Sequence, residues 1–90
     1  MRAELVEIYG NTPNAAVMRH PGRRFPGILV QGDTLSILHT QAADLCDQIE
    51  PSSNAFEIAK DIKDHLFDLL MNYERVLAEH GIELPYFRSR

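Results

Sequence analysis

The most regular cluster of chemically active side chains in this 90-residue chain is a set of four carboxylates. They are Glu57, Asp61, Asp64 and Asp68. Their spacing is four, three and four positions, and a helix turns by about 100° per residue, so all four lie in one narrow stripe. Like charges at this spacing destabilise a helix, and the neighbouring Lys60 and Lys63 offset only part of the repulsion.

Carboxylates arranged in this way favour binding over catalysis. General acid–base catalysis needs burial that raises one carboxyl pKa, and a divalent metal ion needs oxygen ligands that converge from several directions. A stripe on one helix provides neither. Two interpretations stay open: a solvated helix face, or an acidic surface that attracts and orients a basic protein partner. The wider charge distribution supports the second, because residues 33–83 contain eleven acidic and three basic residues, with Asp44 and Asp47 in the preceding helical segment.

A second cluster of charged residues is basic. The segment HPGRRFPG at residues 20–27 contains Arg23 and Arg24 and follows Arg19. Glycines let a backbone approach a ligand closely and arginines donate paired hydrogen bonds, so this turn is suited to bind a phosphate, carboxylate or nucleotide. Its spacing matches neither a P-loop nor a dinucleotide-binding motif. The alternative is a tight turn whose arginines stay in water or pair with the acidic helices.

The remaining reactive residue types show no catalytic spacing. The four histidines, at positions 20, 39, 65 and 80, form no HxH or HExxH motif, and no Ser–His–Asp arrangement stands out. Cys46 is the single cysteine, so no intramolecular disulfide is available, and its apolar helical surroundings predict a small buried side chain. We therefore expect no enzymatic activity, no metal site and no cofactor.

The elements that position these clusters follow from the periodicity of the apolar residues. The pattern predicts strands at about 3–9, 15–19 and 27–31 and helices at about 33–49 and 54–80. The expected fold is a single α+β domain over residues 1–90. In it, a small N-terminal antiparallel sheet of two or three strands packs against a C-terminal two-helix hairpin.

Capping residues mark the ends of the two expected helices. Asp33 is suited to cap the first helix, because its carboxylate accepts hydrogen bonds from free backbone N–H groups. Asn54 with Glu57 fits a capping box at the start of the second helix, and Ser53 is an alternative cap. Gly81 is a typical stop for that helix.

Apolar residues at helical spacing predict which helix faces make contact. The expected stripes are Leu35, Leu38, Ala42, Leu45 and Ile49 in the first helix, and Ile58, Ile62, Leu66, Leu69, Tyr73, Val76 and Leu77 in the second. Phe67, Leu70 and Met71 widen the apolar face of the second helix beyond one stripe. Such a helix packs on two sides or lends one side to another chain, so these three residues predict an association surface, for example in a homodimer.

The overall composition restricts the class of protein. A hydrophobic fraction of 44% is ordinary for a globular chain, and a net charge of −4 lacks the positive surface that nucleic-acid binding requires. No apolar run is long enough to span a bilayer, and Glu4 and Glu7 interrupt the apolar segment that a signal peptide would need. We expect a cytoplasmic protein that binds neither membranes nor nucleic acids.

One stretch of the chain carries a family resemblance. PGRRFPGILVQGDTLSIL at 21–38, preceded by EIYGNTPNAAVMRH, resembles a family of small bacterial proteins of unknown function. Its members share a basic PGR-FPG turn, an apolar strand, a Gln-Gly-Asp sequence and a helix, and no functional residue is transferred by the resemblance. Small acidic proteins of this kind are often encoded beside bacterial toxins as immunity proteins. By that analogy we expect an inhibitor that occludes a toxin enzyme, with an anion-binding accessory protein and a homodimeric structural module as alternatives.

Overall fold

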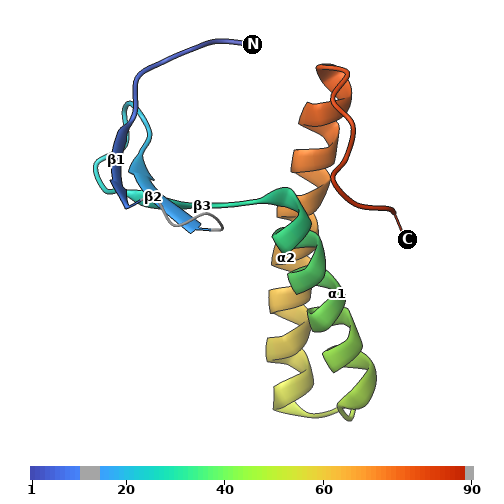
Figure 1. The fold of residues 1–90 in the computed structure, drawn as a ribbon. Coiled ribbons are helices and arrows are strands. Elements are labelled where there is room, and N and C mark those ends of the chain that lie inside the picture. The colour runs from blue at the N-terminus through green and yellow to red at the C-terminus, as the bar shows by residue number, and fades with distance from the viewer. Residues whose placement is uncertain (11–14, 89–90) are drawn as a thin grey trace. The chain divides into compact units, whose positions relative to one another are not determined.

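The structure is a computed structural model that describes residues 1–10 and 15–88. A three-stranded antiparallel sheet precedes two helices, which confirms the predicted α+β class (Figure 1). The elements are β1 (Glu7–Gly10), β2 (Ala15–Arg19), β3 (Gly27–Val30), α1 (Gly32–Gln48) and α2 (Asn54–Glu79). The chain forms two compact units, a sheet unit from Met1 to Gln31 and a helical unit that begins at Gly32. The packing of the sheet on the helices and the organisation of residues 1–90 as one domain stay predictions.

The sheet has the order β1-β2-β3, and its middle strand pairs with both neighbours. Glu7 lies opposite Arg19, and Ala16 lies opposite Leu29. The first strand was expected at residues 3–9, but only residues from Glu7 onward join the sheet. The reason lies in the partner strand: β2 ends at Arg19, and Pro21 two residues later has no N–H to donate to a longer ladder.

A tight turn separates β2 from β3. The backbone N–H of Arg23 donates to the carbonyl oxygen of His20 at 3.1 Å, which closes the turn. Gly22 has a φ of +83°, a conformation that side chains with a Cβ rarely adopt, so glycine suits this position. The prolines and glycines of the HPGRRFPG segment therefore act first as turn residues.

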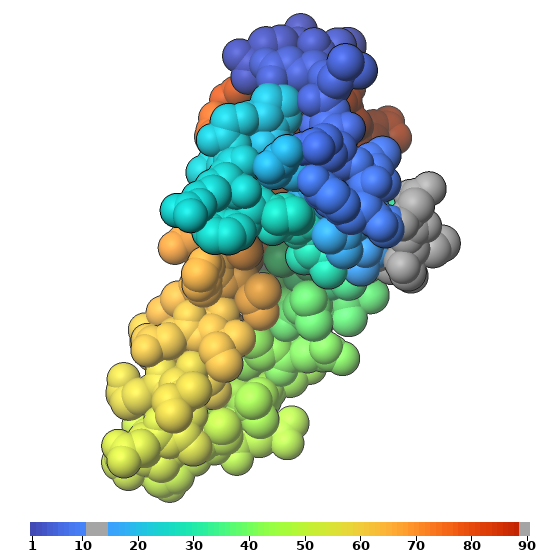
Figure 2. All heavy atoms as spheres, turned by 90° about the vertical axis from the view of Figure 1, so that its left-hand side faces the viewer, coloured from blue at the N-terminus to red at the C-terminus, as the bar shows by residue number. Residues whose placement is uncertain are grey.

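The helical unit is an antiparallel hairpin in which α1 and α2 lie side by side (Figures 1 and 2). Ser53 caps α2, because its hydroxyl oxygen accepts a hydrogen bond from the Phe56 N–H at 3.1 Å. The capping box predicted for Asn54 and Glu57 is therefore wrong: Asn54 is the first residue of the helix, and the alternative cap, Ser53, is the one used. Gly81 ends α2 as predicted: its φ is +65°, and the N–H of Ile82 donates to the carbonyl oxygen of Leu77 at 2.9 Å.

The start of α1 differs from the prediction by one residue. The helix begins at Gly32, so Asp33 lies inside its first turn, where its carboxylate accepts from the Thr34 N–H at 2.9 Å. Gly32 is buried, and a Cβ built there would overlap the ring of Tyr73. The absence of a side chain thus lets the first turn of α1 approach α2.

The core of the helical unit follows a line between the two helices. This interhelix line contains the buried residues Gly32 and Cys46 of α1 and Ala59 and Leu70 of α2. The expected burial of Cys46 is confirmed. Five residues of the predicted stripes are instead between 41% and 63% exposed, namely Leu38, Leu45, Ile58, Ile62 and Leu69. Apolar spacing alone does not distinguish a line of helix contact from the neighbouring line, which is rotated by one residue.

Neither α1 nor α2 combines the length and apolar character that crossing a membrane requires.

Candidate functional site

The acidic ridge of α2, formed by Glu57, Asp61, Asp64 and Asp68, is exposed along its length. Lys60 Nζ donates a hydrogen bond to Asp64 Oδ2 at 2.8 Å, four residues along the helix. This bond and the attraction between the charges lower the pKa of Asp64 and raise the pKa of Lys60. Asp64 is therefore ionised at neutral pH, and the ridge presents negative charge to the solvent.

The ridge faces away from the interhelix line. Asp68 precedes the buried Leu70 by two positions, which is about 200° around the helix. The two acidic residues of α1 that were predicted to extend this surface, Asp44 and Asp47, are also exposed. Asp44 precedes the buried Cys46 by two positions, so it points away from α2 and is not brought together with the ridge.

A hollow of about 430 Å³ lies beside the ridge in the helical unit. Its walls are His39 and Ala43 of α1 and Lys63, Asp64 and Phe67 of α2. The rings of His39 and Phe67 are 5.4 Å apart between centroids. The hollow therefore combines an apolar lining with the ammonium group of Lys63 and the carboxylate of Asp64, which is already paired with Lys60.

The predicted association surface is divided by the fold. Phe67 is exposed and Met71 is half-buried, but Leu70 is fully buried on the interhelix line. Leu70 is therefore part of the core of the helical unit and is unavailable for contact with another molecule.

The three arginines around the HPGRRFPG turn do not converge on one point. Arg19 forms a hydrogen-bonded ion pair with Glu7 across β1 and β2, which raises the pKa of Arg19. The Arg24 guanidinium lies 5.3 Å from the centre of the Phe25 ring, within the range of a cation–π contact. Arg23 lines a shallow hollow of about 370 Å³.

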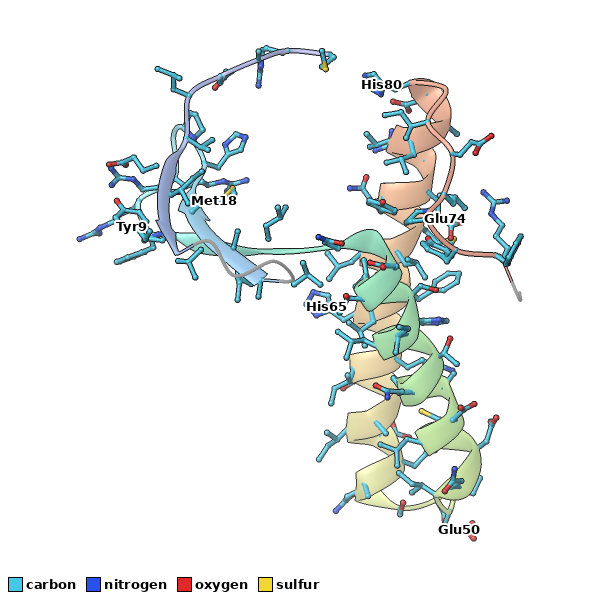
Figure 3. The ribbon with its side chains drawn as sticks, in the orientation of Figure 1. Tyr9, Met18, Glu50, His65, Glu74 and His80 are labelled. Atoms are coloured by element: carbon cyan, nitrogen blue, oxygen red, sulfur yellow. The ribbon has the colours of Figure 1, made fainter. Side chains whose placement is uncertain are left out.

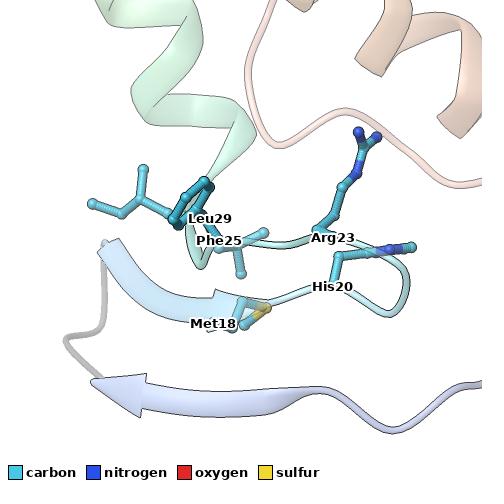
Figure 4. A pocket seen from close by; sticks show the side chains of 7 residues that line it. Met18, His20, Arg23, Phe25 and Leu29 are labelled. Atoms are coloured by element: carbon cyan, nitrogen blue, oxygen red, sulfur yellow. The ribbon is translucent and has the colours of Figure 1, made fainter.

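The hollow in the sheet unit is largely apolar. Its lining residues are Met18, His20, Arg23, Phe25, Gly27, Ile28 and Leu29 (Figure 4). Arg23 and His20 are the two lining residues able to carry positive charge. The arrangement suits an amphipathic anion better than the bare phosphate cradle that the sequence suggested.

A family model gives the relationship of the chain to known proteins. The model of a family of unknown function, DUF6959, matches residues 1–86. The chain belongs to this family. No curated protein and no solved structure matches the chain. The match confirms the predicted membership of a family of unknown function, and it spans the basic turn, both helices and Tyr86.

This family member also contains a buried carboxylate that the sequence reasoning missed. Glu74 of α2 is buried, and it lies beside the C-terminal segment that runs back along the helix (Figure 3). Tyr86 donates its hydroxyl hydrogen to Glu74 Oε2 at 2.8 Å, and Arg88 Nε lies 3.2 Å from Glu74 Oε1. The signal in the sequence was the four-residue spacing between Leu70 and Glu74, which places Glu74 close to the interhelix line. These contacts attach the end of the chain to α2.

Metal binding finds no support in the geometry of the described part of this family member. Among residues 1–10 and 15–88, no three His, Cys, Asp or Glu side chains lie close enough together to hold a metal ion. The acidic ridge and the two hollows are therefore the surfaces to which a function is best assigned.

Proposed function

We propose that this chain is a non-catalytic binding protein that holds a basic protein against the acidic ridge and the adjacent hollow of its helical unit. The observation that carries the proposal is the exposure of all four ridge carboxylates beside an apolar-lined hollow. Negative charge on the ridge speeds and orients the encounter with a positive surface, while a partner side chain inserted in the hollow supplies buried contact area.

The partner class that fits best is a bacterial toxin enzyme, with this chain as its immunity-type inhibitor in the cytoplasm. Such an inhibitor would cover a basic surface of the enzyme, and residues 33–83 of this chain contain eleven acidic and three basic residues. An inhibitor of this type needs no catalytic group of its own.

Charge reversal at two positions tests this proposal. Asp61→Lys/Asp68→Lys alters the ridge, and Glu4→Lys/Glu83→Lys is a control with the same change in net charge at exposed positions elsewhere. Each tagged protein is purified from the native host at low salt, and the bound proteins are identified and quantified. We expect the wild type and the control to retain one stoichiometric basic enzyme, whose activity is lost in the complex, and the ridge variant to retain less than a tenth of it.

Two results would refute the proposal. One is equal retention of the enzyme by the ridge variant, which would exclude the ridge as the contact surface. The other is the absence of a stoichiometric basic partner of the wild type in the native host.

A second candidate function rests on the hollow of the sheet unit. Because Arg23 lies at a largely apolar hollow of about 370 Å³, we propose as the alternative an accessory protein that binds an amphipathic anion such as a nucleotide. ATP should then raise the melting temperature of the wild type and of Arg24→Ala, whose guanidinium lies over Phe25, but not that of Arg23→Ala. An equal response of both variants would exclude Arg23 as the anion ligand.

A further inference from the structure

We draw no further inference here: the strongest candidate, the buried Glu74 carboxylate of α2 beneath the C-terminal segment, is already engaged by Tyr86 and Arg88 of that segment, and nothing in the structure shows a ligand or partner that would take their place.

Discussion

Two consecutive leucines of α2 have opposite surroundings. Leu70 is fully buried on the interhelix line, whereas Leu69 is 49% exposed. The residue type is the same, so the difference comes from the direction of each side chain relative to α1. Burial of apolar surface stabilises the folded state by about 25 cal/mol for each Å². Apolar surface that stays in water does not contribute this free energy to the folding of the helical unit. The comparison shows that only one of two neighbouring apolar lines of α2 is buried within the helical unit.

The largest expected effect comes from truncating each leucine in turn. Leu70→Ala should lower the free energy of unfolding by about 2–5 kcal/mol, because it removes a fully buried side chain and leaves a cavity. Leu69→Ala should cost about 1 kcal/mol or less, because half of its side chain is already in water. Urea unfolding at low protein concentration measures both values, and equal losses would contradict the assignment of Leu70 alone to the core.

A substitution at Gly32 tests where the interhelix line ends. Alanine normally stabilises a helix relative to glycine, but a Cβ at Gly32 would overlap the Tyr73 ring. Gly32→Ala should therefore destabilise the protein by about 1–3 kcal/mol, the usual cost of overpacking. Gly27→Ala in β3 is the control, because a Cβ there meets nothing within 4 Å. Thermal denaturation that shows Gly32→Ala to be as stable as the wild type would refute the close approach of Tyr73.

The C-terminal segment of the chain contacts α2 at the buried Glu74. Tyr86→Phe removes the hydroxyl group that donates to the buried Glu74 carboxylate and should cost about 1–2 kcal/mol. Phe87→Leu changes a fully exposed neighbour and should leave stability unchanged. Hydrogen exchange of the α2 amides near Glu74 should also become faster in Tyr86→Phe alone. Equal exchange in both variants would mean that the hydrogen bond does not hold the C-terminal segment.

The smallest expected effect concerns the acidic ridge. The Asp64 pKa lies below its ordinary value of 3.8 because Lys60 donates a hydrogen bond to it. A lowered carboxyl pKa stabilises the folded chain above that ordinary value, and this contribution is lost as the pH falls through the folded-state pKa. Lys60→Gln should move the Asp64 pKa back towards 3.8, and Lys63→Gln should move it less. Carboxyl NMR titration measures both shifts, and the reverse order would contradict the assigned partner.

Local signals in the sequence were sufficient for most of the fold. Pro21 and Gly81 limit their elements for steric reasons that act within a few residues, so the ends of β2 and α2 could be predicted. The ion pair of Arg19 with Glu7 could not, because it depends on the register between two strands. The choice between Ser53 and Asn54 as the cap of α2 could not be predicted either, because the two neighbouring residues offer the same capping chemistry.

The candidate surfaces were predictable in part. The four-residue and three-residue spacing of Asp61, Asp64 and Asp68 was enough to place them on one exposed stripe. The burial of Leu70 and the exposure of Leu69 were not predictable, because both fit an apolar helix face and only the position of α1 separates them. The contact of Tyr86 with Glu74 joins residues twelve positions apart through a reversal of the chain after Gly81, which spacing within a helix does not encode.

The most direct test of the two apolar lines is an NOE experiment on the chain with ¹³C-labelled methyl groups. It detects side chains that lie close to each methyl group in the folded chain. The account predicts stronger NOEs to α1 side chains from the methyl groups of the buried Leu70 than from those of the half-exposed Leu69. Stronger NOEs to α1 from Leu69 than from Leu70 would contradict the account.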